Sequence, residues 1–283
     1  MTFAFEDLVR KGTGALAASG IANPRRDANL LLRLAADLSP EQALTGPRAI
    51  DQNAAQTFER YVTRRGRGEP VSRIRGRREF WSLDFEITPA TLDPRADSEV
   101  LVAAVIQVLA DRGLTAPRIL DLGTGSGCLL ISLLAEFPQA VGVGVDVNPT
   151  AAAIALRNAA TNGVDRRANF VVSNWHAAIG AQFDVVISNP PYIPTSAIQS
   201  LDPDVRVFDP HLALDGGRDG LSCYRAIAGT LPNLLSEGGF AAVEIGMGQA
   251  DAVAAIFGGA GLTETKIWPD LAGIPRCLTV EKG

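Results

Sequence analysis

The segment FDVVISNPPYIP, residues 183–194, places Asn189, Pro190, Pro191 and Tyr192 directly after an apolar run that is typical of a buried strand. Two consecutive prolines stiffen the loop and remove two backbone donors, while the carbonyl groups of Asn189 and Pro190 can still accept hydrogen bonds. A rigid turn alone would also explain the two prolines. The alternative is a loop that holds hydrogen-bond acceptors still for chemistry.

Such a loop suits nucleophilic attack by a planar NH2 group. The nitrogen of an amide or an adenine is a poor nucleophile because its lone pair is delocalised into the neighbouring π system. If the Asn189 side chain and the Pro190 carbonyl accept its two N–H groups, the lone pair turns toward an electrophile such as the methyl group of a sulfonium. Tyr192 can pack against the planar group. We therefore predict Asn189, Pro190 and Tyr192 as catalytic residues, and Asn189 to Tyr192, including Pro191, as the acceptor-binding loop.

A second set of residues is placed to bind the methyl donor. The segment DLGTGSG follows an earlier strand candidate, and its glycines let the backbone approach a ligand at the positive end of the next helix. Asp146 ends the following strand, 19 residues after Gly127, where a carboxylate can accept both hydroxyls of a ribose. These features fit NAD as well as S-adenosylmethionine, and Asp146 could instead cap the helix at Asn148. The predicted donor-binding turn consists of Gly123, Thr124, Gly125, Ser126 and Gly127.

Trp175 follows the next strand candidate. It can stack on an adenine ring or fill the core beside the sheet, and the sequence leaves both roles open.

Strands and helices alternate from residue 118 onward, which predicts an α/β fold with a doubly wound, mainly parallel sheet. The carboxyl ends of such strands form the ligand site, so the loops described above should meet there. Two final strands are a candidate antiparallel edge pair. The expected strands are 118–123, 141–147, 169–173, 183–189, 239–246 and two within 264–283.

The first 68 residues instead predict a helical domain. Asn23 before Pro24 is typical of a helix start, with Leu30, Leu31 and Leu34 on one face. Ser39 to Gln42 has the spacing of a capping box, and Asp51 starts a helix with an apolar stripe that includes Phe58. We predict domains at 1–68 and 97–283, joined by a strand-containing connector at 69–96.

Charge is unevenly distributed between these parts. Residues 1–79 carry a net charge of +5 and the remainder −10. One interpretation of the excess arginines is a solvated helix end and linker; the other is a docking surface for an acidic or RNA-associated partner. The arginines concerned are Arg60, Arg64, Arg65, Arg67, Arg73, Arg75, Arg77 and Arg78.

Several classes of protein are disfavoured. The N-terminus lacks the pattern of a secretion signal, and no apolar run reaches the roughly 20 residues of a membrane-spanning helix, so we expect a cytoplasmic protein. Three widely spaced cysteines do not indicate a disulfide framework. With two histidines in the chain, we expect no metal in the reaction.

The chain closely resembles the bacterial N5-glutamine methyltransferases that modify peptide-chain release factors. The likeness includes NPRRDANLLL, the segment from residue 63 to 99, ILDLGTGSG, SNPPYIP and DVRVFDPHLALDGGRDGLSCYRAI. The resemblance implies a Rossmann-like, seven-stranded S-adenosylmethionine-dependent methyltransferase domain with a small all-helical N-terminal domain. It further implies that S-adenosylmethionine, converted to S-adenosylhomocysteine, binds at Gly123 to Gly127, Asp146, Trp175 and Asn189.

For the methyl acceptor, the resemblance implies that residues 189–192 hold the glutamine of the release factor's Gly-Gly-Gln motif. The N-terminal helices would then help to recognise this protein substrate, and an indirect association with the ribosome stays open.

Two segments depart from the family pattern. Where the family usually has Leu-Ile-Pro-Arg-Pro, this chain has Asp93 and Ala96 in the second and fifth positions, which puts the local loop conformation in question. Near the C-terminus, GIPRCL replaces a more usual polar loop.

Three other functions remain open. A glutamine methyltransferase acting on a ribosomal protein would use the same loop. A DNA adenine-N6 methyltransferase poses the same chemical problem, but it must flip a base and usually has a broad basic face, so we expect no direct DNA binding. An RNA-associated binding module with a methyltransferase fold would have no use for an aimed amide at Asn189.

Overall fold

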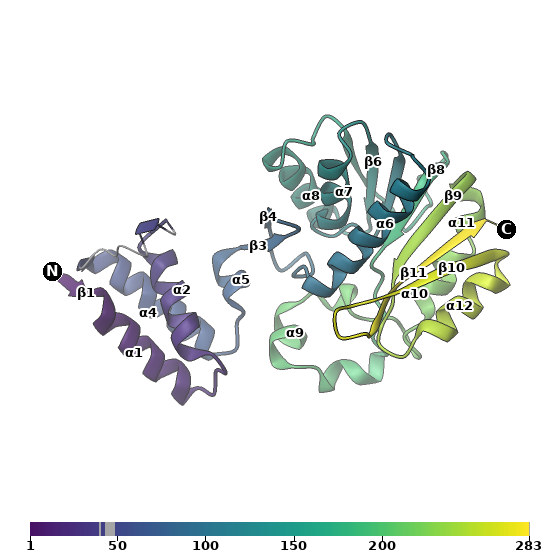
Figure 1. Ribbon diagram of the computed structural model, residues 1–283. Coiled ribbons are helices and arrows are strands. Elements are labelled where there is room, and N and C mark those ends of the chain that lie inside the picture. Colours follow the sequence, from purple (N-terminus) through teal and green to yellow (C-terminus); the bar gives the residue numbers. More distant parts are fainter. Residues whose placement is uncertain (40, 43–48, 283) are drawn as a thin grey trace. The chain divides into compact units, whose positions relative to one another are not determined.

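The computed structural model describes residues 1–39, 41–42 and 49–282, and the chain divides into two compact units (Figure 1). The first unit comprises Met1–Gly76 and Asp202–Phe208, and the second Arg77–Leu201 and Asp209–Gly283. Within the described residues, the helices are too short or too polar to span a lipid bilayer.

The first unit is built mainly from helices packed around one apolar core. Gly12 lies where two helices approach closely, since a Cβ there would be 2.5 Å from the Phe58 ring. The core contains Leu16, Leu31 and Leu32. The elements are β1 (Thr2–Ala4), α1 (Phe5–Ala18), α2 (Pro24–Ala35), β2 (Ala49–Asp51), α4 (Gln52–Gly66), α5 (Val71–Arg75) and α9 (Pro203–Phe208), with β1 antiparallel to β2.

The predicted helix starts are largely confirmed. Pro24 is the first residue of α2, although the side chain of Asn23 before it makes no capping hydrogen bond. The Asp51 side chain caps α4 by accepting a hydrogen bond from the Ala54 N–H. Ser39 and Gln42 exchange the two bonds of a capping box, although Pro40 and residues 43–48 lie outside the described residues. The prediction for Leu30 is wrong: its side chain is 37% exposed, because the buried face of α2 runs instead through Ala28, Leu31 and Leu32.

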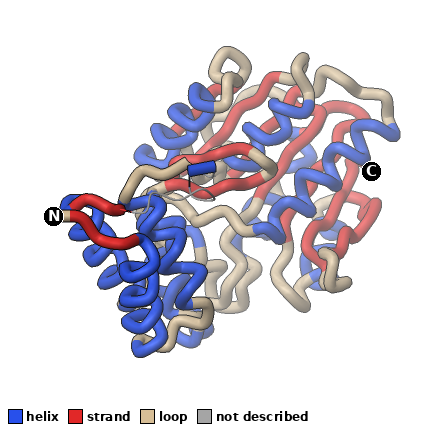
Figure 2. Tube along the Cα trace, turned by 60° about the vertical axis from the view of Figure 1, so that its left-hand side comes forward, coloured by secondary structure: helices blue, strands red, loops and turns tan. Residues whose placement is uncertain are grey.

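The second unit contains a β-sheet, whose strands are drawn in red in Figure 2. The sheet has seven strands in the order β10-β11-β9-β8-β5-β6-β7. β5 to β9 are parallel, and β11 is antiparallel to both β9 and β10, which confirms the predicted edge pair. The strands are β5 (Arg118–Leu122), β6 (Val141–Asp146), β7 (Ala168–Val172), β8 (Phe183–Ser188), β9 (Leu235–Glu244), β10 (Leu262–Pro269) and β11 (Pro275–Lys282).

The central strands are apolar on both faces because helices cover both sides of the sheet. Along β5, Ile119 packs into one core and Leu120 into the other, as the alternation of side chains in a strand requires. One face is covered by α6 (Glu99–Asp111), α7 (Cys128–Glu136) and α8 (Pro149–Thr161), and the other by α10 (Ser222–Ala228), α11 (Leu231–Leu234) and α12 (Ala250–Gly259) (Figure 1).

Strand β9 differs from the prediction in where it begins. β9 begins at Leu235, four residues before the predicted start, and its pairing with β8 is shifted near Gly238, whose φ is 71°. A glycine pair such as Gly238 and Gly239 marks an irregularity within a strand rather than its end.

The connector forms a hairpin of β3 (Arg77–Phe80) and β4 (Leu83–Glu86). Its two turn residues, Trp81 and Ser82, have φ of 51° and 57°.

Candidate active site

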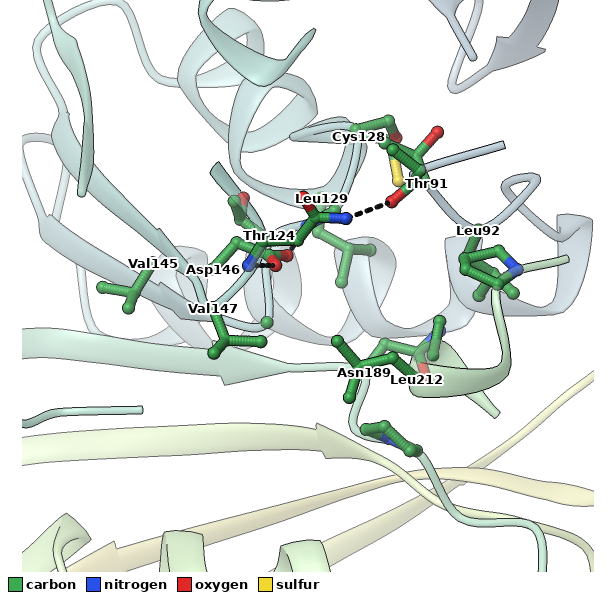
Figure 3. Close-up of a pocket in the computed structure, with 18 of the residues that line it drawn as sticks. Thr91, Leu92, Thr124, Cys128, Leu129, Val145, Asp146, Val147, Asn189 and Leu212 are labelled. Atoms are coloured by element: carbon green, nitrogen blue, oxygen red, sulfur yellow. Dashed lines mark hydrogen bonds between the residues drawn. The ribbon is translucent and has the colours of Figure 1, made fainter. Parts of the chain in front are cut away.

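A cavity of about 360 Å³ lies in the second unit beyond the carboxyl ends of the central strands. This is the expected ligand position in an open α/β sheet, and the volume is within the usual range for small-molecule sites. Loops after β5, β6, β7 and β8 all contribute to its wall, together with residues from 90–98 and 210–215. In Figure 3, Thr124 and Asp146 lie on one side of this cavity and Asn189 and Leu212 on another.

The glycine turn after β5 requires glycine at several positions. Gly123, Gly125 and Gly127 have φ of 78°, 56° and 81°, a region that other residues enter only with strain. A Cβ on Gly127 would also lie 2.9 Å from the Ile131 side chain. Gly123, Thr124, Gly125 and Ser126 line the cavity, while Gly127 precedes the first residue of α7.

Asp146 is held in place by two backbone groups. Its Oδ2 accepts a hydrogen bond from the Gly125 N–H and its Oδ1 from the Asn148 N–H, both at 2.8 Å. The cap of α8 is the Asn148 side chain, which accepts from the Thr150 N–H. Asn148 thus provides the helix cap, and Asp146 lies in the cavity wall.

Asp121, the first residue of the DLGTGSG segment, is a buried carboxyl to which the sequence analysis assigned no role. Its Oδ2 accepts a hydrogen bond from Thr124 Oγ1 at 2.6 Å, directly behind the glycine turn. Burial raises the pKa of Asp121 to about 7, against the opposing effect of the Thr124 hydroxyl. Asp121 thus holds the glycine turn through Thr124, and its pKa lies near neutral pH.

Trp175 lies where either of the roles left open by the sequence could be fulfilled. Its side chain lines the cavity and also packs against the core of one sheet face. Its φ of 49° is unusual for a bulky residue, and such strain is typically stored where a side chain is held for function.

Asn189 is oriented by a hydrogen bond to a distant part of the chain. Its Nδ2 donates to Ser98 Oγ at 3.2 Å, and within the described residues its Oδ1 accepts no side-chain or backbone donor. Asn189 and Pro191 line the cavity, whereas Pro190 is buried and is not among the lining residues.

Tyr192 is fixed at both its hydroxyl and its backbone. The hydroxyl donates to Glu244 Oε1 at 3.3 Å, and the Tyr192 carbonyl accepts a hydrogen bond from Gln249 Nε2 at 3.0 Å. Two glycines allow the chain to approach: a Cβ on Gly216 would lie 2.8 Å from Tyr192 Cα, and one on Gly220 would lie 2.4 Å from its carbonyl oxygen. Tyr192 therefore packs beside the cavity without being one of its lining residues.

Glu244 ends β9 and lies behind this loop. Burial raises the pKa of its carboxyl to about 7, while Ser98, Tyr192 and the Arg276 charge act in the opposite direction. Burial also raises the pKa of the Tyr192 hydroxyl, and the negative charge of Glu244 adds to this effect. The tyrosine therefore keeps its proton at neutral pH.

The atypical segment around Asp93 still forms part of the cavity wall through its neighbours Leu92, Pro94 and Arg95. Asp93 itself is buried, with Arg78 Nε 3.7 Å from its Oδ1. Arg95 forms a 2.5 Å ion pair with Asp209, which ties this segment to the loop before His211. The buried Asp93 carboxyl thus has an arginine charge nearby within the fold.

The arginine-rich segment is largely engaged in internal ion pairs, which favours the structural interpretation of its charge. Arg64 pairs with Glu69, Arg65 with Asp27, and Arg77 with Asp84. Arg60 and Arg67 remain exposed.

The sequence analysis missed several residues that hold the site together. Glu244 had a signal, since it is the acid at the end of an apolar strand, but Ser98, Gln249 and Asn158 had none. Asn158 on α8 is buried and donates to the carbonyls of Glu86 and Ser126 while accepting from the Glu86 N–H. It joins the hairpin to the glycine turn.

Comparison with known proteins agrees with this architecture. Residues 97–201 match the family model described as methyltransferase small domain, and residues 7–76 match the PrmC N-terminal domain. A methyltransferase from Pyrococcus furiosus shares the fold, with a TM-score of 0.53 and 17% identity over 71% of this chain and 89% of that one. The predicted methyltransferase fold is confirmed.

Curated relatives identify the family. A release factor glutamine methyltransferase of Rhodospirillum rubrum is 47% identical over 97% of this chain and 84% of its own length. One of Caulobacter vibrioides is 42% identical over 96% of this chain and 95% of its own. The resemblance seen in the sequence is confirmed: this chain belongs to the release factor glutamine methyltransferase family.

Proposed function

We propose that this protein transfers a methyl group from S-adenosylmethionine to the side-chain amide nitrogen, N5, of the glutamine in the Gly-Gly-Gln motif of peptide-chain release factors. The observation that carries the proposal is the orientation of Asn189. Its amide nitrogen is engaged by Ser98, which leaves its oxygen as an acceptor in the same cavity as the glycine turn and Asp146.

The cavity fits the proposed donor. The backbone of Gly123 to Gly127 leaves room that side chains would fill, and Asp146 offers carboxylate oxygens for the ribose hydroxyls. Trp175 offers an aromatic face for the adenine. When bound, S-adenosylmethionine supplies a methyl group on a positively charged sulfur, whose S–C bond breaks as the substrate nitrogen forms its N–C bond, leaving S-adenosylhomocysteine.

Residues 189–192 make the glutamine amide nitrogen more reactive by fixing its orientation. Asn189 Oδ1, in the cavity wall, accepts one N–H group of the glutamine amide, and the carbonyl of Pro190, a buried residue between two lining residues, accepts the other, so that the lone pair points away from both. Tyr192, which stays protonated, packs against the amide and is not a base. The nitrogen loses one proton to solvent. Fixing the reacting groups in contact in this way can lower a barrier by about 7–11 kcal/mol.

The protein substrate calls for recognition outside the cavity, and we propose that the N-terminal helical domain, residues 1–68, provides it. Several statements remain predictions: the domain limits drawn from the sequence, the cytoplasmic location, the indirect association with the ribosome and a reaction without a metal. Among the described residues, no group of three or more His, Cys, Asp or Glu side chains could hold a metal ion.

Incubation with labelled S-adenosylmethionine and separate samples of release factor, ribosomal protein and DNA tests the proposal. We expect label on the release factor alone, and mass measurement should place a single methyl group on the glutamine of its Gly-Gly-Gln motif. Label on ribosomal protein or DNA would show that the enzyme methylates that substrate instead. Absence of label from all three would contradict an enzymatic role and support a binding module.

A further inference from the structure

Ser98 occupies an unusual position for a serine at a helix start. It lies at the N-cap of α6, where a serine hydroxyl commonly accepts a backbone N–H, yet its side chain makes no capping bond. The residue is only 3% exposed. Its oxygen instead accepts the hydrogen bond from Asn189 Nδ2.

This bond decides which end of the Asn189 amide faces the cavity. An asparagine side chain has a donor end and an acceptor end of nearly the same size, so its two flipped states differ mainly in their hydrogen bonds. With Nδ2 directed to Ser98, Oδ1 is left to accept from a substrate. The flipped amide would present its own NH2 group to the NH2 group of a glutamine, and two donors repel.

Glu244 interacts with the Ser98 hydroxyl. The interaction with Ser98 lowers the pKa of Glu244, and Glu244 Oε2 is buried without a fixed partner among the described residues. As a carboxylate, Glu244 can accept a hydrogen bond from the Ser98 hydroxyl, which leaves a Ser98 lone pair to accept from Asn189. Tyr192 donates to Glu244 Oε1, so the same carboxyl contacts Tyr192 directly and can act on Asn189 through Ser98.

We propose that Ser98 is a positioning residue that fixes the flip state of the Asn189 amide, with Glu244 orienting the Ser98 hydroxyl from behind. The inference rests on the proposed function, because it concerns the acceptor that holds the substrate amide. Ser98 does not touch the reacting atoms and acts through Asn189.

The test compares Ser98→Ala, which removes the hydroxyl, with Ser98→Thr, which keeps it. Ser132→Ala is the matched control: Ser132 is also buried, lies on α7, and its hydroxyl has no hydrogen-bond partner among the described residues. We expect Ser98→Ala to lower kcat for release factor methylation at least tenfold, and Ser98→Thr to restore it to within about threefold of the wild type. The affinity for S-adenosylhomocysteine, measured by calorimetry, should stay within twofold in all three variants.

A second readout separates positioning from a general structural role. We expect Ser98→Ala to weaken binding of a Gly-Gly-Gln peptide in the presence of S-adenosylhomocysteine, but to have no further effect in an Asn189→Ala background. An equal loss in both backgrounds, a parallel loss of S-adenosylhomocysteine affinity, or an unchanged kcat would overturn the inference. If Ser98→Ala does not fold, Ser98→Cys, whose thiol is a weak acceptor, takes its place against Ser98→Thr.

The outcomes also distinguish this inference from the proposed function. If the wild-type protein fails to methylate release factor, the proposed function fails. If the wild type does so and Ser98→Ala matches it, only the role of Ser98 fails.

Discussion

The Tyr192 hydroxyl donates a hydrogen bond to Glu244, a carboxyl that is buried at the end of β9. Burial raises the pKa of the Glu244 carboxyl to about 7, so both its charged and its neutral form are accessible near neutral pH.

We expect Glu244→Gln to change the pH dependence of stability. Burial raises the pKa of Glu244 to about 7 from the ordinary glutamate value of 4.5, so the folded state binds the proton more tightly than the unfolded state. The stabilisation from this proton is present below the unfolded pKa and is lost as pH rises through the folded pKa. Between pH 5 and 8 the wild type should therefore lose up to about 3 kcal/mol relative to the variant.

Urea unfolding of both proteins at several pH values measures this difference. Asp121, whose pKa is also about 7, is present in both and cancels in the comparison. Parallel pH profiles would show that Glu244 does not carry the shifted proton.

Asn158→Ala should weaken both stability and donor binding. The side chain is buried, and its loss leaves the Glu86 N–H and two carbonyls without their partners, which costs about 2–4 kcal/mol. Asn162→Ala is the control, since Asn162 lies on the same helix and bonds to the hairpin at Asp84 but not to the glycine turn. Calorimetry should show weaker S-adenosylhomocysteine binding for Asn158→Ala alone; equal affinities would show that the turn does not depend on Asn158.

Gly220→Ala should disturb the acceptor-binding loop. Gly220 has a φ of 76°, and a Cβ there would lie 2.4 Å from the Tyr192 carbonyl oxygen. Gly238 has a similar φ of 71° but nothing within 4 Å of its Cβ position, so Gly238→Ala bears the backbone strain alone, about 1–2 kcal/mol. We expect methyl transfer to fall roughly tenfold or more in Gly220→Ala and to persist in Gly238→Ala. Equal rates would mean that the close approach at Tyr192 does not matter for transfer.

The exposed arginines of the first unit test the proposed recognition of the protein substrate. Replacing Arg60 and Arg67 by glutamate should lower kcat/KM for intact release factor about fivefold or more, with little effect on a Gly-Gly-Gln peptide, because charge at a docking surface acts on encounter. The same change in net charge at Arg10 and Lys11, which are exposed on α1, is the control. Similar losses for both pairs, or for both substrates, would argue against docking at Arg60 and Arg67.

The sequence predicted those parts of the protein that depend on local patterns. Alternating apolar strands and helices predicted the succession of strands along the chain, and glycines with positive φ marked the turn after β5. The glycine turn, Asp146 and Asn189 lie at one cavity because parallel strands end at the same edge.

The residues that could not be predicted act between segments far apart in the chain. Ser98 meets Asn189 across 91 positions, and Asn158 reaches Glu86 across 72. No local pattern specifies such pairs, since a buried serine or asparagine becomes informative only when its partner is known. Leu30 illustrates the same difficulty within one helix: it is apolar and adjacent to the buried face of α2, so the sequence analysis assigned it to that face, but it is exposed.

The most direct test of the account is methyl transfer by Asn189→Ala, measured with intact release factor and S-adenosylmethionine, together with the affinity for S-adenosylhomocysteine. Loss of one of the two acceptors for the glutamine amide should abolish transfer while donor-site affinity stays within a few-fold of the wild type. An Asn189→Ala protein that methylates release factor at the normal rate would contradict the central claim.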